Sequence, residues 1–549
     1  MRVWGGWLFC TALATLTNCS ASPAVVAAQD GGTDALAEAS TDAGCGSPSA
    51  CASTNEGRTA ARLEAVRTDG SALSVFLTAM PKGGDLHNHL SGAVYAETFL
   101  NWAQADGLCV STSSHTLVAK SQCGGTNAPI PDPGNDLYDR VVRAWSMQDF
   151  ANSAGESGHD HFFATFGKFG LAAGSHRADM IADVVARAAG ENQIYVELMA
   201  GFTGAAATLG AEVRGGGKPA ITVLELPDYY EALIANAKWS GVLASINKYI
   251  DDTDKDARTA MGCSGNPVPP ACEVTVRYQA QTSRSASAHE LFAEWTAAFE
   301  VAKTEKRMVG LNLVGPEDGS SALRDYELHM AMLGFLHDKY VATEASPLRI
   351  ALHAGELSSG VLAAGNQSHL TFHIRRAVEV AHASRIGHGA DVLLETDSTG
   401  LLAEMAKAGV LAEICLASND QILELSGAAH PLSDYISAGV PVALATDDQG
   451  VARSSLALEH RRAVIDQQLD YRTLKRLARW SLEKSFASGK SLWQSLESMS
   501  TVADCQPDGT FWLGDISPPS ACKTLLSTSD RARLEWELER RFVAFEQVQ

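Results

Sequence analysis

The feature that most constrains the fold is a repeated alternation of short apolar runs with longer amphipathic stretches. Such runs occur eight times, at residues 84–90, 194–199, 274–278, 308–314, 349–353, 384–388, 410–416 and 441–445. Eight buried strands separated by helical patterns favour an α/β fold of the (β/α)₈ TIM-barrel type. The alternative is a doubly wound open sheet, but no G-x-G-x-x-G motif follows the first run.

The composition predicts one large folded domain after an N-terminal leader. With 549 residues and 46% hydrophobic content, the chain can bury a large core. No second change of composition follows residue 60, so we expect a single barrel domain with C-terminal helices at 60–549. Two insertions, 106–136 and 251–270, interrupt the alternation and carry cysteines. We expect both to be disulfide-pinned loops.

The first residues predict export. Arg2 precedes a mostly apolar stretch at 3–16, which is typical of a signal peptide at 1–21 and too short for a transmembrane segment. Cleavage after Ala21 or Ala28 is one interpretation, and lipidation of Cys19 as a membrane anchor is another. Residues 22–59, rich in Ala, Ser and Asp, are expected to form a disordered tether. The protein is thus expected to be secreted, periplasmic or anchored as a lipoprotein.

Cysteine spacing supports an oxidising compartment. Apart from Cys10 and Cys19, most cysteines form local pairs in loop-like sequence, and no C-x-x-C motif suggests a metal site. Cys415 has no local partner and is expected to be an inert buried thiol. The predicted pairs are Cys45 with Cys51, Cys109 with Cys123, Cys263 with Cys272, and Cys505 with Cys522.

The net charge restricts the partners. A formal charge of −21 argues against binding nucleic acid through its phosphates, because no basic groove is evident. A small neutral ligand fits this charge better.

Polar residues gather where the predicted strands end, which is where a barrel of this type places its reactive groups. His87 and His89 end the first strand, and the H-x-H spacing puts both imidazoles on one face. His353 ends the fifth strand and His388 the sixth. Asp447, followed by Asp448, ends the eighth. For one such residue a structural role would suffice, but their shared position at strand ends indicates a common site.

Four of these residues form a plausible ligand set for one catalytic zinc ion (Zn²⁺) per chain. Zinc in catalytic sites takes three or four nitrogen or oxygen ligands and a water. The set comprises His87, His89, His353 and Asp447. No lysine in 308–315 could be carboxylated to bridge two metals, so a single ion is expected. The imidazoles favour zinc over magnesium, while iron, cobalt and nickel accept similar ligands.

Two further residues remain for acid–base work. A bound metal would make hydroxide available near neutral pH, and this nucleophile must be positioned. His388 and Glu356 are available for positioning it and for protonating the substrate. Glu356 follows His353 by three residues, and a carboxyl group with a raised pKa there would be a proton donor.

At these residues the sequence resembles the adenosine/AMP deaminase family of metal-dependent amidohydrolases. The segment 80–90 resembles the family's M-P-K-x-x-L-H-x-H-L signature, with one extra residue before Leu86. His-Ala-Gly-Glu at 353–356, Arg-Ile-Gly-His-Gly at 385–389, Ser-Asn at 418–419 and Thr-Asp-Asp at 446–448 follow in the family's order. The likeness extends from residue 80 to 451.

The resemblance implies roles for individual residues. Glu356 would protonate purine N1, and His388 would orient and deprotonate the attacking water. Asp448 would contact N7 and the backbone of Gly315 would contact N3. Phe162 and Phe166 lie in a run that resembles the helix roofing the nucleoside pocket, although both could equally be core residues. The implied reaction converts adenosine, and 2′-deoxyadenosine, to the inosine product and ammonia.

Some features depart from the family pattern or leave alternatives open. Ser91 stands where the family often has an aspartate that reaches the ribose 5′-hydroxyl, which puts the sugar preference in doubt. Another 6-aminopurine or a modified nucleoside is the alternative substrate, and a non-catalytic purine-binding protein is the alternative class. The zinc ligands of cytidine-type deaminases, H-x-E and P-C-x-x-C, are absent.

Overall fold

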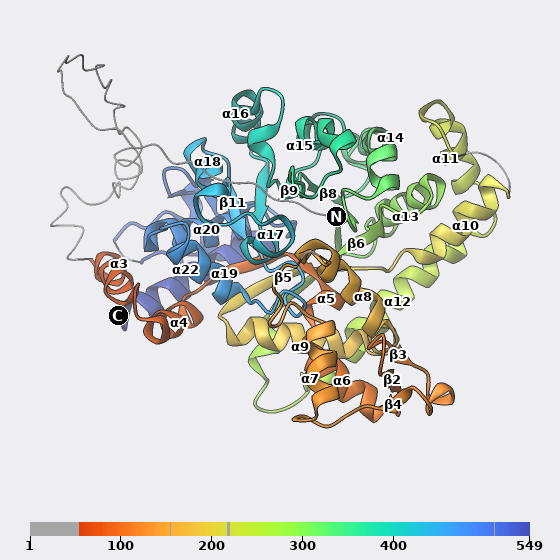
Figure 1. Cartoon of the computed structure of the whole chain (residues 1–549). Helices are drawn as coiled ribbons and strands as arrows, with labels where there is room; N and C mark the ends of the chain where they lie inside the picture. Colours follow the sequence, from red (N-terminus) through yellow and green to blue (C-terminus); the bar gives the residue numbers. More distant parts are fainter. Residues whose placement is uncertain (1–53, 154, 217–219, 510) are drawn as a thin grey trace, which may run out of the picture. The chain divides into compact units, whose positions relative to one another are not determined.

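Eight parallel strands form the centre of the computed structural model (Figure 1). It describes residues 54–153, 155–216, 220–509 and 511–549. Each strand pairs in parallel with the next along the chain, so the predicted barrel order is confirmed. The strands are β1 (Gly83–His89), β5 (Gln193–Ala200), β6 (Thr275–Ser283), β7 (Met308–Val314), β8 (Arg349–Ala354), β9 (Arg385–His388), β10 (Leu411–Ile414) and β11 (Val442–Leu444).

The barrel closes between its first and last strands at the predicted metal ligands. The backbone N–H of Asp447 donates to the carbonyl of His87 at 2.8 Å, and that of His89 donates to the carbonyl of Asp447 at 3.1 Å. A parallel bridge between Asn88 and Asp447 results. The backbone contact that completes the barrel therefore also sets the spacing of three site residues.

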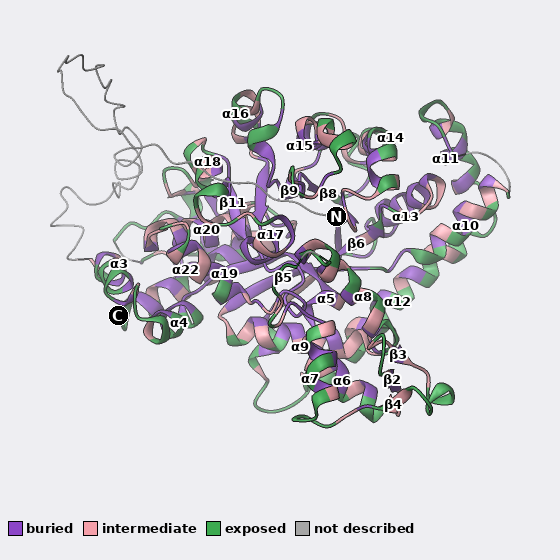
Figure 2. Cartoon of the chain, viewed as in Figure 1, coloured by how far each residue is buried: buried purple, intermediate pink, exposed green. Residues whose placement is uncertain are grey.

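Helices surround the barrel, and burial is concentrated in the strands and in the helix faces toward them (Figure 2). Helix α13 is mostly buried and begins with a capping box between Ser287 and Glu290. The other helices of at least eight residues are α3 (Asn55–Val66), α4 (Gly70–Ala79), α6 (Ala96–Ala105), α7 (Asp136–Ala144), α8 (Gly158–Ser175), α9 (Arg177–Gly190), α10 (Gly204–Arg214), α11 (Leu226–Ile234), α12 (Trp239–Ala260), α14 (Ser320–Leu336), α16 (Ser398–Ala408), α17 (Leu416–Leu423), α19 (Leu456–Ile465), α20 (Tyr471–Glu483), α21 (Ser520–Thr528) and α22 (Asp530–Gln547), and α13 spans Ala288–Val301.

Both predicted loop insertions contain more regular structure than expected. Residues 106–136 include a three-stranded antiparallel sheet, β2 (Cys109–Ser111), β3 (Leu117–Val118) and β4 (Asn127–Pro129). In 251–270, the prediction of a loop is wrong for the first ten residues, because α12 continues to Ala260 with Ile250, Thr253 and Ala257 buried.

The predicted disulfides are confirmed wherever the structure describes both cysteines. Cys109 bonds to Cys123 beside the small sheet, and Cys263 bonds to Cys272 across the turn after α12. Cys505 bonds to Cys522, and Cys415 is buried and free. The pair Cys45 and Cys51 lies outside the described residues.

The folded part begins before the predicted boundary at residue 60. Helix α3 starts at Asn55, and the Thr54 hydroxyl accepts a hydrogen bond from the Gly57 N–H at 2.9 Å. Glu56 forms ion pairs with Arg472 and Lys475, which the local composition of the segment did not reveal. The end of the predicted tether is therefore helical, while the predicted signal peptide at 1–21 and residues 22–53 lie outside the described residues.

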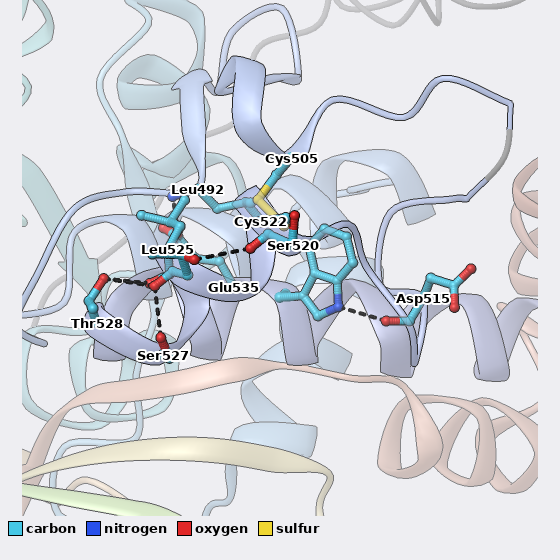
Figure 3. Close-up of a disulfide and its surroundings, with 11 residues drawn as sticks. Leu492, Cys505, Asp515, Ser520, Cys522, Leu525, Ser527, Thr528 and Glu535 are labelled. Carbon is cyan, nitrogen blue, oxygen red and sulfur yellow. Dashed lines mark hydrogen bonds between the residues drawn. A yellow bond between two sulfur atoms is a disulfide. The ribbon is translucent and has the colours of Figure 1, made fainter.

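The C-terminal segment, residues 492–536, has a small apolar cluster of its own. A hairpin of β12 (Trp493–Ser495) and β13 (Ser500–Thr501) precedes the Cys505–Cys522 disulfide, which Figure 3 shows above the C-terminal helix. Trp536 packs in this cluster and donates from its indole nitrogen to the Asp515 carbonyl at 3.0 Å. No helix among the described residues has the length and apolar character needed to cross a membrane.

Candidate active site

Three imidazoles and one carboxylate converge at the carboxyl end of the barrel. The Nε2 atoms of His87 and His89 each lie 3.0 Å from the Nε2 atom of His353. The Oδ1 atom of Asp447 lies 3.5 Å from the Nε2 of His87 and 3.3 Å from that of His89. All four side chains are buried. The structure thus brings together the four residues that the sequence predicted as one ligand set.

These separations fit a single small metal ion. Four ligand atoms arranged tetrahedrally at about 2.0–2.1 Å from zinc are about 3.3 Å from one another. The observed distances of 3.0–3.5 Å lie on both sides of that value. Without a cation or a shared proton, the facing nitrogen lone pairs would repel one another. The donor set therefore fits a divalent ion of the zinc type.

Each imidazole is held by a hydrogen bond at its other nitrogen. His87 Nδ1 lies 2.7 Å from a carboxylate oxygen of Glu413, and His353 Nδ1 lies 2.8 Å from the amide oxygen of Asn312. His89 Nδ1 has a longer contact of 3.4 Å with Gln281 Oε1. Oxygen acceptors at Nδ1 hold the proton there and leave the Nε2 lone pairs for a metal.

Local charges make the cluster attractive to a cation. Burial by itself lowers the pKa of His87, but Asp447 and Glu413 outweigh it and raise that pKa to about 10. Burial would raise the pKa of the Asp447 carboxyl, yet hydrogen bonds from His87 and His89 hold it well below its usual range. The pKa of His353 is lowered well below its usual value by burial and by these two histidines. The site thus favours one positive charge shared among its ligands.

A buried ion network lies beneath the ligands. Arg385 on β9 pairs with Glu413 at 2.6 Å and with Glu197 at 2.5 Å, and all three side chains are inaccessible to solvent. Glu413 connects this network to His87. Buried charges of this kind need partners on every side, so the network fixes the direction of the His87 ring.

Asp447 adopts a backbone conformation that its neighbours support. Its φ is +57°, in the left-handed region that residues other than glycine seldom adopt. The preceding residue, Thr446, donates from its hydroxyl to Asp85 at 2.5 Å, and Asn88 donates to that same hydroxyl at 2.9 Å. These bonds hold the turn that directs the Asp447 carboxylate toward the imidazoles.

Glu356 is a buried carboxyl group that lies close to other carboxylates. Burial, together with the carboxylates of Asp447 and Glu317, raises the pKa of Glu356 well above its usual range. Its backbone N–H and that of Gly355 each donate to Glu317 at 3.1 Å. Burial would raise the pKa of Glu317, but Arg284 and His373 lower it to about 2. Glu317 therefore holds the turn that carries Glu356, and the raised pKa of Glu356 favours its protonated form.

His388 faces the same space from β9. Its Nε2 lies 3.7 Å from Glu356 Oε1, is buried and has no hydrogen-bond partner among the described residues. Burial lowers the pKa of His388 to about 3. A buried polar nitrogen without a protein partner requires one from a ligand or a water.

Beside the ligands lies a pocket of about 390 Å³, within the usual size for a small-molecule site. Its lining includes all the residues predicted for substrate contact: Ser91, Phe162, Phe166, Gly315 and Asp448. Phe162 is also buried in the barrel core and Phe166 packs against that core, so both interpretations of these residues hold. Gly92 leaves room for Asp448, since a Cβ there would lie 1.6 Å from Asp448 Oδ1.

Asp448 is set to donate a hydrogen bond. Burial is the main cause that raises its pKa to about 8, and the Asp447 carboxylate adds to it. Its Oδ1 atom is buried and has no partner among the described residues. A neutral carboxyl group in this position can donate to a nitrogen acceptor of a ligand.

Sequence reasoning missed the residues that support the ligands. Glu413, Asn312, Glu197 and Gln281 lie on barrel strands and point toward its interior. A signal was present for Glu413, Asn312 and Glu197: each is a polar residue inside an apolar run, and a barrel strand that is buried on both faces leaves such a residue no solvent. Gln281 is half-buried and lies beyond the predicted run 274–278, so it gave no such signal. Glu317 lies in a loop and gave no comparable signal.

Comparison with protein-family models gives one match that bears on these residues. The model described as adenosine deaminase matches residues 242–501, which include His353, Glu356, His388 and Asp447 in the family's order. Over these residues the chain is similar to the adenosine/AMP deaminase family. This family is metal-dependent, and the buried cluster fits a metal site.

Several curated members of this deaminase family share part of the sequence. An adenine deaminase from Sinorhizobium fredii is 27% identical over 192 residues, covering 35% of this chain and 52% of that protein. An adenosine deaminase from Plasmodium gallinaceum is 30% identical over 118 residues, covering 21% of this chain and 32% of that protein. The chain thus spans about half the length of the first of these relatives.

Among solved structures, an apo N6-methyl-AMP deaminase from Arabidopsis thaliana is similar to this chain. The two are 19% identical with a TM-score of 0.47, and the match covers 76% of this chain and 94% of that chain.

The Glu413–His87 contact generates a prediction about metal affinity. Substituting Glu413→Gln removes the carboxylate that orients His87 and raises its basicity, so metal affinity should fall about 10- to 100-fold. Competition with a chromogenic chelator measures this. Glu459→Gln, at a buried carboxyl that bonds to Ser454 instead, is the matched control. Equal metal affinity in the two variants would show that Glu413 does not support the site.

Proposed function

We propose that the protein catalyses zinc-dependent hydrolytic deamination of adenosine and 2′-deoxyadenosine, releasing ammonia and the corresponding inosine. One observation carries this proposal: the buried carboxyl of Glu356, whose pKa is raised, lies 3.7 Å from His388, and both lie beside the cluster of His87, His89, His353 and Asp447. This arrangement combines a metal site, a proton donor and a water-facing imidazole around one pocket.

Zinc is the proposed ion because three of its four ligands are imidazoles, which suit zinc better than magnesium or calcium. When bound, zinc would supply a hydroxide nucleophile near neutral pH by lowering the pKa of a coordinated water. The chain's own residues perform the remaining tasks.

The carboxyl groups match the nitrogens of a purine. Glu356 would donate its proton to N1 as the C6 carbon is attacked. That proton would neutralise the negative charge that the attack places on the ring. Asp448, also neutral, would donate to N7, and the backbone N–H of Gly315 would reach N3. Attack of the water oxygen at C6 and loss of the amino group as ammonia, with one proton added to it, balance the reaction.

The pocket favours a nucleoside or a base over a nucleotide. None of its described lining residues is a lysine or an arginine, so no cation stands ready to neutralise a phosphate. Ser91 and Ser283 offer hydroxyl groups that can bond to sugar hydroxyls. These features support a neutral substrate such as adenosine.

Free adenine is the second candidate substrate. The relatives from Sinorhizobium are described as adenine deaminases. Ser91 also replaces the aspartate through which the family often contacts the ribose. A modified 6-aminopurine nucleoside fits the same pocket chemistry.

The substrate is tested by following absorbance in the adenine band with zinc-loaded protein and adenosine, 2′-deoxyadenosine, adenine or AMP. We expect a chelator-sensitive change with the two nucleosides and little with AMP. Turnover of adenine alone would establish the second candidate. No change with any of the four, from folded protein holding one metal, would contradict the proposal and favour a modified purine or a binding protein without activity.

Two substitutions separate proton donation from metal binding. Glu356→Gln should keep the metal and the fold but lower kcat about 10²- to 10⁴-fold, since the donor of the proton is lost. His353→Ala should lose the metal. Metal content by mass spectrometry and kcat by absorbance provide the two readouts. Near-normal turnover in Glu356→Gln would show that another group protonates the substrate.

We also propose that the protein is exported. Three disulfides among the described residues support an oxidising compartment. The mass of the mature chain would distinguish cleavage after Ala21 or Ala28 from lipidation at Cys19, and recovery of the uncleaved chain from the cytoplasm would contradict export.

A further inference from the structure

A second pocket, of about 660 Å³, lies at the opposite end of the barrel from the metal cluster. It is lined by residues at the amino ends of the strands, including Met308 of β7, Arg349 of β8 and Ser384 just before β9. Residues 483–489, after α20, and Arg531 of α22 complete it. No part of the proposed reaction uses this pocket.

Most of the lysine and arginine side chains that line this pocket form no ion pair among the described residues. That is unusual in a chain whose net charge is −21. Its lining contains Lys306, Arg349, Lys484 and Arg531, none of which has a carboxylate within 4.0 Å among the described residues. Among the described residues, the Arg349 side chain donates only to the carbonyls of residues 347 and 348. The one acidic lining residue, Glu483, is engaged by Ser491 and Glu535.

The positive side chains in this pocket repel one another, and one of their N–H donors has no hydrogen-bond acceptor among the described residues. Burial and the neighbouring Arg531 lower the pKa of both Arg349 and Lys484. The Nε atom of Arg531 is buried without a hydrogen-bond partner among the described residues. Glu344 and Glu483 oppose the lowering of these two pKa values only in part. Like charges held close together are destabilising, and an anion bound between them would reduce that repulsion.

The wall that carries these cations is held rigidly. Phe486 donates from its backbone N–H to Glu197 at 2.8 Å, and the carbonyl of Lys484 accepts from Arg385 at 3.3 Å. Both partners belong to the buried ion network inside the barrel. The backbone that carries Lys484 is therefore held in place by the interior of the barrel.

We propose that this pocket binds a small anion of the phosphate type, carrying one or more phosphate groups. Guanidinium and ammonium groups converging from several elements are the usual phosphate-binding set. The apolar part of the lining, from Met308, Val309 and Phe486, leaves space for an organic portion of such a ligand.

Calorimetric titration of the whole protein with pyrophosphate, and separately with inorganic phosphate, at constant ionic strength tests this site. We expect saturable binding of pyrophosphate, and weakening of at least about tenfold in Lys484→Gln/Arg531→Gln, because two charge-assisted contacts are lost. Saturation by inorganic phosphate as well would identify a single phosphate group as sufficient. Arg62→Gln/Lys255→Gln, which removes two charges outside the pocket, should bind as the unmodified protein does.

An equal affinity in the pocket variant and the unmodified protein would overturn the proposal, because the anion would then bind elsewhere, the metal centre included. No binding of either anion would overturn it as well. If the double variant fails to fold, Lys306→Gln/Arg349→Gln, at two exposed positions, provides the same comparison.

A different observation concerns the protonation of His388. The Leu432 N–H donates to Nδ1 of His430 at 3.1 Å, and Nε2 of His430 lies 3.0 Å from Oδ1 of Asn419. Nδ2 of Asn419 lies 2.9 Å from Nδ1 of His388. The side chains of His430, Asn419 and His388 are all inaccessible to solvent.

The chain of bonds has only one consistent proton arrangement. A backbone N–H can only donate, so Nδ1 of His430 must accept, and burial keeps this ring neutral by lowering its pKa to about 4. The proton of His430 is then on Nε2 and is donated to the Asn419 oxygen. The Asn419 amide nitrogen must therefore donate to His388 Nδ1.

Resting on the proposed function, we infer that His430 and Asn419 are positioning residues that keep neutral His388 protonated at Nε2. His388 then presents an N–H to the attacking water and orients it as a hydrogen-bond donor. This differs from the role of base that the family resemblance implies, because the nitrogen facing the water has no free lone pair in this tautomer.

Nitrogen-15 NMR of histidine-labelled, metal-loaded protein reports the tautomer without reference to turnover. We expect the His388 signals, assigned by their loss in His388→Gln, to show an unprotonated Nδ1. Asn419→Asp, which can only accept, should move the proton to Nδ1 and lower kcat at least tenfold while KM changes less than about threefold. His329→Phe, at a buried histidine without hydrogen-bond partners, is the control.

An Nδ1-protonated His388 in the unmodified protein would overturn the inference. So would Asn419→Asp with unchanged His388 signals, and so would a kcat that is unchanged or raised. A correct tautomer in a protein that deaminates none of the tested purines would instead contradict the proposed function, so the two failures can be told apart.

Discussion

The close approach of three imidazole nitrogens and one carboxylate oxygen is the interaction on which the rest of the site depends. Separations of 3.0–3.5 Å between buried lone-pair donors are unfavourable unless a cation or a shared proton lies between them. Two carboxylates of the chain stabilise a positive charge at this position. Asp447 contributes a carboxylate, and Glu413 supplies a second negative charge at the far side of His87.

The backbone hydrogen bonds that close the barrel also fix the relative positions of the predicted metal ligands. Asp447 exchanges backbone hydrogen bonds with His87 and His89, so the last strand meets the first at the ligands themselves. The ion network of Arg385, Glu413 and Glu197 fills the interior just below. A substitution in this network is therefore expected to change metal affinity before it changes the packing of the surrounding helices.

The sequence predicted the strands well, and it predicted which polar residues the structure brings together at the strand ends, because both follow local rules. All eight strands were found within a few residues, except that β6 continues five residues beyond its predicted end at 278. Reactive residues at strand ends are set by the barrel geometry. The small sheet at 109–129 was missed because strands of two or three residues carry no usable periodicity.

Residues that act through tertiary contacts could not be read from the sequence in the same way. Glu317 holds the Glu356 turn from a loop 39 residues earlier, and nothing in its local pattern indicates that partner. The start of α3 was missed because Glu56 finds its ion-pair partners on α20, more than 400 residues away. His430 likewise reaches His388 only through Asn419.

Anomalous X-ray diffraction from crystals of the zinc-loaded protein, recorded on both sides of the zinc absorption edge, tests the central claim most directly. We predict one zinc peak per chain, bonded to the Nε2 atoms of His87, His89 and His353 and to the carboxylate of Asp447, with His388 outside bonding distance. A peak bonded to other residues, or no peak among these four from protein that retains its zinc, would contradict the proposed metal centre.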